Sequence, residues 1–266
     1  MAMTQQHRAR KRFGQNFLHD QGIISRIVRA IGPRPDQRLL EIGPGQGAIT
    51  SELVDSGCHL DVIELDRDLL PILMDKFGDQ DNFHLHEGDA LKFDIPALAG
   101  DNRLRVVGNL PYNISTPLIF HLLSAHQCID DMHFMLQKEV VDRLAAQPGS
   151  KTYGRLGIMA QYYCHIDALF EVPPECFSPR PKVQSAIVRL TPHRELPCPA
   201  DNVTVLQNIL REAFNQRRKT LRNTLKSVIS ADQIDALGID SGSRPERLSL
   251  AEFVQIANHV HHTATQ

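Results

Sequence analysis

The sequence lacks a cysteine framework and any long apolar run. Its five cysteines are odd in number and form no CxxC pair. This predicts reduced thiols in a cytosolic protein rather than a disulfide framework or a zinc site. No apolar run is long enough to cross a bilayer, and no signal-peptide core precedes Phe13–Asn16. We interpret His261–His262 as part of a frayed terminus and not as a metal site. Together these features lead us to expect a soluble, cytoplasmic protein without a metal centre.

An excess of charge is also missing, because the net charge is only -2 over 266 residues. Basic residues nevertheless concentrate in the segments 1–18, 178–194 and 211–226, where Glu212 is the only acid. A single charge run usually marks a solvated face, but three acid-poor segments favour a phosphate-binding surface built from separate parts. The basic side chains of these segments are Arg8, Arg10, Lys11, Arg12, Arg180, Lys182, Arg189, Arg194, Arg211, Arg217, Arg218, Lys219, Arg222 and Lys226.

The first two thirds of the chain alternate short apolar runs with helical patterns. Such alternation predicts βαβ units and a parallel sheet covered on both faces. Beyond a proline-containing linker, 191–202, only helical patterns occur, with capping-box spacings at Ser230–Gln233 and Ser249–Glu252. We therefore expect an α/β domain over residues 1–195 and a small α-helical domain over residues 196–266.

A glycine-rich turn, Gly43–Gly47, follows the first predicted strand, and Glu64 and Asp89 follow the next two. Glycines here let the backbone approach a ligand closely. Glu64 does not separate NAD from S-adenosylmethionine, because a strand-two acid binds adenosine ribose in dinucleotide enzymes as well. The GxGxG spacing and Asp89, an acceptor for the adenine amino group, favour the methyl donor. So does Glu41, which would repel a pyrophosphate but not a cation.

Asn109–Tyr112 follows the apolar run 104–107, at the edge of the sheet where open α/β folds bind ligands. Its side-chain amide, its backbone carbonyl and its aromatic face together suit a planar group that carries an amino group. The alternative is a strand followed by a proline-containing turn with a buried tyrosine.

Motifs along nearly the whole chain resemble those of the ribosomal-RNA adenine dimethyltransferases. In the cofactor half the matching stretches are Glu41–Gly47, Val62–Asp66, Gly88–Ala90 and Asn109–Ser115. Outside it, the matching stretches of the bacterial 16S rRNA branch are Arg10–Leu18, Phe134–Val140, Pro179–Val183 and Glu212–Thr220.

The resemblance implies a Rossmann-like class I fold with a seven-stranded, mostly parallel sheet and an antiparallel last strand. It also implies transfer of two methyl groups from S-adenosylmethionine to N6 of each of two adjacent adenosines. These lie in a hairpin loop near the 3′ end of 16S rRNA, within the immature 30S subunit. By the same resemblance, the residues expected at the cofactor are Asn16, Leu18, Gly43, Gly45, Glu64, Asp89 and Asn109.

With adenine as the target, the tetrapeptide acquires a mechanism. The Asn109 side-chain oxygen and the Leu110 carbonyl would accept hydrogen bonds from the two N6–H groups and localise the nitrogen lone pair. No general base is then needed until after the transfer. Tyr112 would stack on the extruded base, and Phe177 would close its other face. For Phe177, a core position beside a proline loop is an equal alternative. We expect Leu110, in place of a second proline, to give the slack that a second methyl needs.

Three other functions compete with this one. A large-subunit rRNA adenine methyltransferase of the antibiotic-resistance type shares the core motifs, although the stretch Asn215–Lys219 favours the small-subunit branch. A non-catalytic rRNA-binding assembly factor would not need the intact Gly43, Glu64, Asp89 and Asn109. An NAD-dependent enzyme is disfavoured by the tetrapeptide. We expect a monomer.

Overall fold

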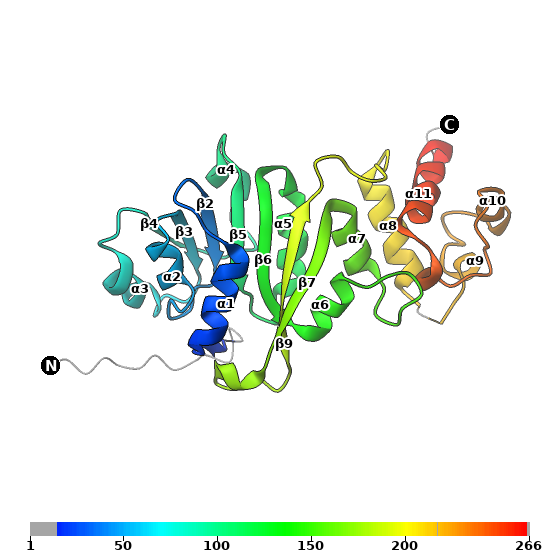
Figure 1. Ribbon diagram of the computed structural model, residues 1–266. Helices are drawn as coiled ribbons and strands as arrows, with labels where there is room; N and C mark the ends of the chain where they lie inside the picture. Colours follow the sequence, from blue (N-terminus) through cyan, green and yellow to red (C-terminus); the bar gives the residue numbers. More distant parts are fainter. Residues whose placement is uncertain (1–14, 217, 265–266) are drawn as a thin grey trace. The chain divides into compact units, whose positions relative to one another are not determined.

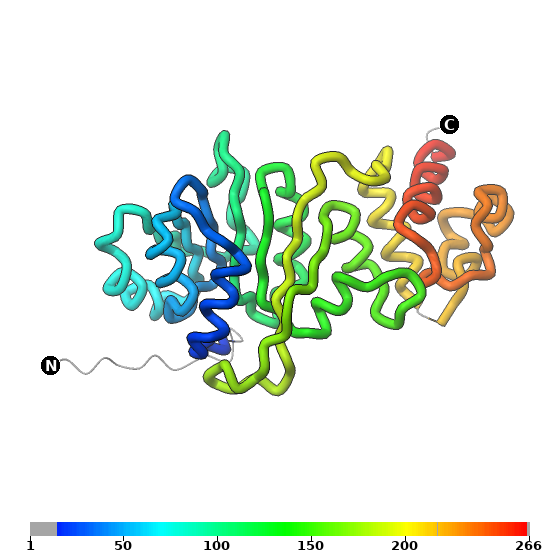
Figure 2. Tube along the Cα trace, viewed as in Figure 1, coloured from blue at the N-terminus to red at the C-terminus, as the bar shows by residue number. Residues whose placement is uncertain are grey.

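The computed structural model describes residues 15–216 and 218–264, so the basic residues at 8–12 and Arg217 lie outside the described part. Two compact units divide the chain (Figures 1 and 2). The first holds the residues up to 141 and residues 167–192, and the second holds residues 142–166 and those from 193 onward. The expected division of roles between residues 1–195 and 196–266 stays a prediction.

The described part of the first unit is built on a seven-stranded sheet in the order β4-β3-β2-β5-β6-β9-β7. The strands β2 to β6 pair in parallel, whereas β9 runs antiparallel to β6. This confirms the expected fold class, including its antiparallel last strand. The strands are β2 (Arg38–Ile42), β3 (His59–Glu64), β4 (Phe83–Glu87), β5 (Leu104–Asn109), β6 (Ile129–Gln137), β7 (Cys164–Val172) and β9 (Ser185–Pro192).

Helices cover both faces of the sheet, and in Figure 1 α1 lies in front of it and α5 behind. Because both faces are covered, the parallel strands can be apolar along their length. A separate two-stranded sheet pairs β1 (Phe17–Leu18) with β8 (Phe177–Ser178). The helices are α1 (Gln21–Ile31), α2 (Thr50–Asp55), α3 (Leu70–Phe77), α4 (Ile95–Ala99), α5 (Ser115–Ser124) and α6 (Lys138–Leu144), the last of which leads into the second unit.

A buried arginine docks α1 onto the sheet. Arg105 on β5 is only 8% exposed and binds Asp131 on the neighbouring strand β6, with an Nη2 to Oδ2 distance of 2.9 Å. Its guanidinium also donates to the carbonyl oxygens of Ile31 and Gly32 at the end of α1. A cation at a helix C-terminus is favourable because the exposed carbonyls there carry partial negative charge. This contact fixes α1, and with it the start of the described chain, over the sheet.

The second unit is helical. Its helices are α7 (Arg155–Tyr163), α8 (Val203–Phe214), α9 (Leu221–Thr224), α10 (Ala231–Ala236), the 3-10 helix η4 (Pro245–Arg247) and α11 (Leu250–Ala264). Both capping boxes form, at Ser230 with Gln233 and at Ser249 with Glu252. The apolar spacing over residues 220–229 predicts a helix along this whole stretch, but α9 is only a single turn. The helix is shorter because Asn and Thr side chains compete for backbone hydrogen bonds. Among the described residues, no helix combines the length and the apolar character that spanning a membrane requires.

Candidate active site

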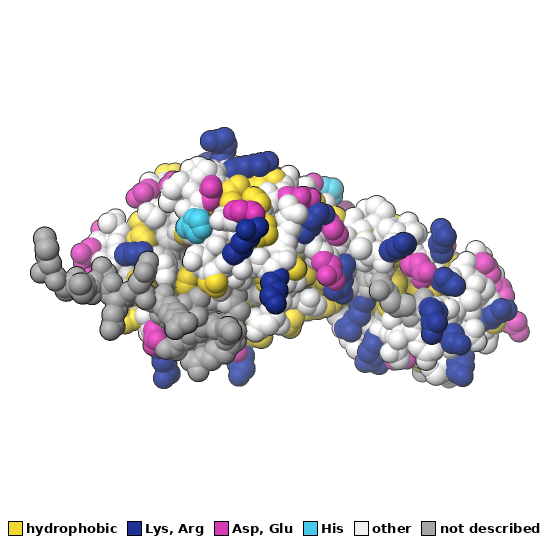
Figure 3. Space-filling view, turned by 90° about the horizontal axis from the view of Figure 1, so that it is seen from below, with side chains coloured by type: hydrophobic (Ala, Val, Ile, Leu, Met, Phe, Trp, Pro, Cys, Tyr) yellow, Lys and Arg dark blue, Asp and Glu magenta, His cyan; other side chains and the backbone are white. Residues whose placement is uncertain are grey.

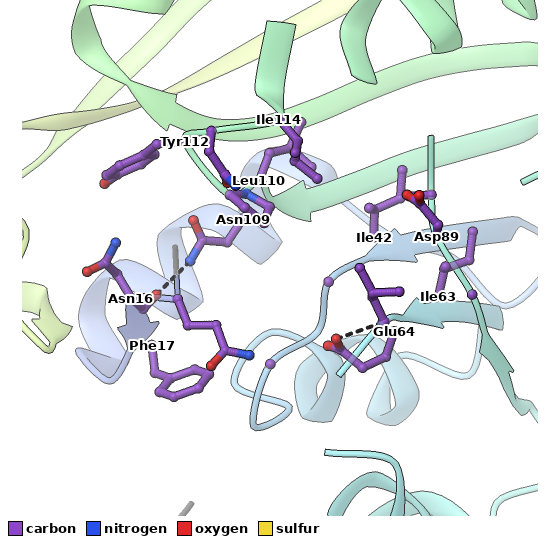
Figure 4. Close-up of a pocket in the computed structure, with 18 residues that line it drawn as sticks. Asn16, Phe17, Ile42, Ile63, Glu64, Asp89, Asn109, Leu110, Tyr112 and Ile114 are labelled. Atoms are coloured by element: carbon purple, nitrogen blue, oxygen red, sulfur yellow. Dashed lines mark hydrogen bonds between the residues drawn. The ribbon is translucent and has the colours of Figure 1, made fainter. Parts of the chain in front are cut away.

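One cavity of about 330 Å³ lies at the carboxyl ends of β2, β3, β4 and β5 (Figure 4). Open α/β sheets bind ligands at this edge, and the volume is at the lower end of the range for small-molecule sites. The segment Gln15–Phe17, which we call the wall segment, forms part of its lining. Of the residues singled out from the sequence, those that line the cavity are Asn16, Gly43, Gly45, Glu64, Asp89, Asn109, Leu110 and Tyr112.

Leu18 and Phe177 do not line this cavity. They face each other in the register of the β1–β8 pair, and both are buried in the hydrophobic core of the first unit. The structure therefore places Phe177 in the core position that the sequence left open as an alternative. Its role in closing the face of a base, and the role of Leu18 at the cofactor, stay predictions.

The glycine turn has the backbone shape that its sequence predicts. Gly43 has a φ of 67° and Gly45 a φ of 60°, both in the region that side chains other than glycine rarely adopt. A Cβ at Gly45 would also lie 3.0 Å from the ring of Phe17. Gly108 is a third tight position, because a Cβ there would lie 2.6 Å from the carbonyl oxygen of Ile42. Gly43 and Gly45 thus allow the backbone of the turn to line the cavity, and Gly108 allows β5 to pack closely against β2.

Two carboxylates are held by their own backbone at the next strand ends. Oε1 of Glu64 accepts hydrogen bonds from the backbone N–H groups of Leu65 and Asp66, each at 2.8 Å. Burial raises the pKa of Glu64, and these backbone N–H groups oppose that rise. Oδ1 of Asp89 accepts from the backbone N–H of Leu91 at 3.0 Å. Each side chain is therefore oriented before any ligand arrives.

A third carboxylate, Glu41, lies behind the glycine turn. It is 2% exposed, and Thr50 Oγ1 donates to its Oε2 at 2.7 Å. Burial raises the pKa of Glu41 to about 7, the Thr50 hydrogen bond opposes the rise, and the charge of Glu64 adds to it. Because a carboxylate without a cation is costly in such a place, a positive charge bound nearby would favour its ionised form.

The orientation of Asn109 is set by the wall segment. Its side-chain nitrogen Nδ2 donates to the backbone carbonyl of Asn16 at 3.1 Å. Since a carbonyl can only accept, the nitrogen must face Asn16, and Oδ1 is turned to the side of Tyr112 (Figure 4). The wall segment is itself tied to the loop after β3, because Gln15 Nε2 donates to Asp66 Oδ2 at 2.9 Å.

Tyr112 is anchored independently of the wall segment. Its hydroxyl and that of Ser185 form a hydrogen bond of 2.7 Å, and Ser185 is fully buried at the start of β9. Burial raises the pKa of the Tyr112 hydroxyl, and the Ser185 bond opposes the rise. The tyrosine ring is therefore held at the cavity by the antiparallel strand. Nothing in the sequence indicates Ser185, because its proximity to Tyr112 depends on where β9 pairs.

A mostly parallel seven-stranded sheet with an antiparallel strand, a glycine turn and acids at successive strand ends define a Rossmann-like methyltransferase. The profile of the family described as ribosomal RNA adenine dimethylase matches residues 6–262 of this sequence. The chain belongs to the ribosomal RNA adenine dimethylase family.

Curated relatives agree over nearly the full length. The chain is 63% identical over 259 residues to ribosomal RNA small subunit methyltransferase A of Pseudomonas syringae pv. syringae (strain B728a), covering 97% of each chain. It is also 63% identical to the protein of the same name from Pseudomonas aeruginosa, again covering 97% of each chain. These matches confirm that the chain is an rRNA adenine dimethyltransferase, as the motifs predict.

Solved structures support the fold. A dimethyladenosine transferase from Plasmodium falciparum superposes with a TM-score of 0.80 at 25% identity, covering 93% of this chain and 98% of the other. The 23S rRNA methyltransferase ErmE superposes with a TM-score of 0.73 at 24% identity, covering 92% and 100%. The second match speaks for the fold alone.

Proposed function

We propose that the chain transfers methyl groups from S-adenosylmethionine to N6 of two adjacent adenosines in the hairpin loop near the 3′ end of 16S rRNA. Its substrate is the immature 30S subunit, and the chain acts as a monomer. The observation that carries the proposal is that Asn109–Tyr112 shares one cavity with Glu64 and Asp89. The small-subunit name of the relatives supports 16S rRNA as the substrate.

The residues of the cavity fit S-adenosylmethionine. Glu64 is an oriented acceptor for ribose hydroxyls, and Asp89 is one for the adenine amino group. Ile42, Ile63 and Leu65 supply apolar walls, as an adenine ring requires. When bound, this cofactor supplies an electrophilic methyl group on a positively charged sulfur. Glu41 lies behind the cavity, separated from the glycine turn by Ile42 alone, and its negative charge would favour a cation bound there.

Asn109 and Leu110 act on the amino group of the target adenine. The N6 lone pair is delocalised into the ring, which makes the nitrogen a poor nucleophile. Oδ1 of Asn109 and the carbonyl oxygen of Leu110 accept hydrogen bonds from the two N–H groups of N6. These hydrogen bonds polarise the amino group and localise its lone pair on the nitrogen. Because both acceptors are held before the base arrives, they stabilise the developing positive charge without reorganising.

Tyr112 holds the plane of the base. Stacking on an aromatic ring contributes about 1–3 kcal/mol per base, which offsets much of the cost of unstacking a loop adenine. The bond from the Tyr112 hydroxyl to Ser185 fixes the ring in advance, so the base does not have to order it.

The proposal is tested by incubating the protein with tritiated methyl donor and immature 30S particles, and then mapping the label by primer extension and nucleoside mass spectrometry. We expect dimethyladenosine at two adjacent 16S positions. Asn109→Ala should abolish transfer while leaving cofactor and RNA binding largely intact. Asn102→Ala, at an exposed asparagine before β5, is the matched control. Label in 23S rRNA, or full turnover by Asn109→Ala, would contradict the proposal.

A further inference from the structure

A second cavity, of about 280 Å³, lies within the helical unit and shares no residue with the active site. It is bounded by the loop before α7, by the end of α8 and by η4. Its lining residues are Ser150, Lys151, Tyr153, Phe214, Pro245 and Glu246. The sequence motifs and the proposed reaction leave this cavity without a role.

The two sides of the cavity are joined by the backbone. The N–H of Gly149 donates to the carbonyl oxygen of Glu246 at 2.6 Å. Gly149 has a φ of 88°, and a Cβ there would lie 3.5 Å from Nη1 of Arg247. The loop and η4 are therefore held together in the absence of any ligand, so the cavity is preformed.

An aromatic ring forms one wall, and its position is fixed by other rings. The centroid of Phe214 lies 6.4 Å from that of Tyr153, with the planes at 71°, and 5.8 Å from that of Phe253. Both Tyr153 and Phe253 are buried. A planar group can stack on a ring fixed in this way without losing further side-chain freedom on binding.

Two polar residues, Ser150 and Glu246, are among those that line the cavity. The hydroxyl oxygen of Ser150 is buried and makes no hydrogen bond to the part of the chain that the structure describes. Such a group is costly unless something binds it. Glu246 also lines the cavity, and its carboxylate oxygen Oε1 lies 4.0 Å from Nη1 of Arg244, the cation that pairs with it. Together they offer an acceptor and a hydroxyl to a ligand that carries N–H donors.

The surroundings are basic. Lys151, Arg244 and Arg247 are exposed around the cavity, and Arg218 and Lys219 follow shortly after Phe214. Figure 3 shows Lys and Arg side chains spread over this unit, at the right of the view. A planar group with N–H donors, attached to a chain of negative charges, is what an RNA nucleotide presents. A lone phosphate would meet Glu246 and an apolar ring, and a metal ion would find one carboxylate beside a lysine.

We propose that this cavity receives one unpaired nucleobase of the rRNA. The base stacks on Phe214, its N–H-bearing edge meets Glu246 and Ser150, and its phosphates lie against the basic residues around the opening. This inference rests on the proposed function, because it takes rRNA as the partner. It assigns the helical unit a base-specific contact besides its charge.

The proposal is tested by whether one substitution, Glu246→Ala, weakens or tightens the binding of RNA. Removing a negative charge from a polyanion-binding surface should tighten RNA binding if charge alone matters. Under the proposal, Glu246→Ala instead weakens binding of the full chain to immature 30S particles by about five- to tenfold. Asp232→Ala, an exposed acid on α10, removes the same charge and should leave binding equal or tighter. Ser150→Ala should weaken binding by a few fold, and thermal melting of each variant controls for folding.

Ultraviolet cross-linking of the wild-type chain to the same particles gives a second readout. We expect a cross-linked peptide that contains Tyr153 or Phe214, joined to one rRNA nucleotide. Tighter binding by Glu246→Ala, or cross-links only outside residues 150–153 and 214, overturns the inference. Methylation of the 16S adenosines by the wild-type chain tests the proposed function separately. Normal methylation together with unchanged binding by Glu246→Ala would overturn this inference alone.

Discussion

The side-chain amide of Asn109 donates to the backbone carbonyl of Asn16, which lies 93 positions earlier in the chain, at 3.1 Å. This hydrogen bond determines which atom of the amide would face the proposed target base, and it cannot be made by a carboxylate. Asn109→Asp would place a negative oxygen against the Asn16 carbonyl. We expect its single-turnover methylation rate at pH 8 to fall by roughly 100-fold or more, comparable to losing one preorganised hydrogen bond in an active site.

The same variant should recover part of its rate in acid. Once the introduced carboxyl is protonated, it can again donate to the Asn16 carbonyl, so the rate relative to wild type should rise between pH 8 and pH 5.5. Rates measured at both pH values on the same RNA provide the check. A wild-type rate at pH 8 would show that the orientation of the amide does not matter.

The bond between Tyr112 and Ser185 should act as a unit. Ser185→Ala and Tyr112→Phe each break it, and each should raise the KM for RNA a few fold through a less ordered ring, with little change in cofactor affinity. The double variant should be no worse than either single one, because the interaction is already lost. Steady-state kinetics of the three variants decide the matter, and additive effects would show that the two hydroxyls act separately.

Leu110→Pro tests how the second methyl is accommodated. After one transfer only one N6–H remains, and we expect proline to stiffen the backbone and favour monomethyl product. The leucine N–H donates to the carbonyl of Met135 on β6 at 3.2 Å, so proline also removes one hydrogen bond to the sheet. Melting temperatures are therefore measured together with the mono- to dimethyladenosine ratio. An unchanged ratio in a folded variant would end the slack hypothesis.

Glu41 should make both stability and cofactor affinity depend on pH. Its pKa is raised from 4.5 to about 7 in the folded state. Between pH 4.5 and pH 7, Glu41 is therefore protonated in the folded protein and ionised in the unfolded chain. The corresponding stabilisation is fully present below pH 4.5 and disappears as pH rises through 7, and it amounts to about 3 kcal/mol. Urea unfolding at pH 5 and pH 8 should show this loss in wild type and not in Glu41→Gln.

Binding of a cation should show the opposite trend. Because positive charge favours ionised Glu41, the affinity for S-adenosylmethionine should rise several-fold from pH 6 to pH 8. Glu41→Gln keeps an acceptor for Thr50 and should flatten the curve. Calorimetric titration measures both proteins, and parallel curves would exclude Glu41 as the cause.

The basic segment 211–226 should govern the salt dependence of RNA binding. A protein that neutralises phosphates loses affinity linearly with the logarithm of the salt concentration. Replacing both Arg218 and Lys219 by alanine should lower that slope by about 1–2, whereas Arg34→Ala, an exposed arginine paired with Asp36, should not. Filter binding across a salt series provides the slopes, and an unchanged slope would remove the segment from the interface.

The sequence predicts those site residues whose position depends only on the strand that they follow and on the turn after it. Glu64, Asp89 and Asn109 each stand at the end of a predicted strand, so the parallel sheet that these strands predict also predicts their meeting at one edge. The contact of Asn16 with Asn109 could not be read in this way, because it depends on where the wall segment crosses the cavity.

Charge was harder to interpret than motif. The segment 178–194 looks uniformly basic in sequence, yet Arg180 pairs with Glu175, and Arg189 binds Asp167 on β7 at 2.9 Å. These acids belong to elements outside the segment, and only the folded chain brings them beside it. The basic surface available to RNA is therefore smaller than the sequence indicates, and the segment 211–226 gains in relative weight.

The two groups proposed to hold the target base are fastened to different parts of the molecule. Asn109 is oriented by the wall segment, which also packs Phe17 against the glycine turn, whereas Tyr112 is fastened to β9. Each methyl transfer consumes one cofactor, so the proposed dimethylation requires an exchange between its two steps. If that exchange displaced the wall segment, the Asn109 amide would lose its hydrogen bond to Asn16, whereas the Tyr112 ring would keep its bond to Ser185.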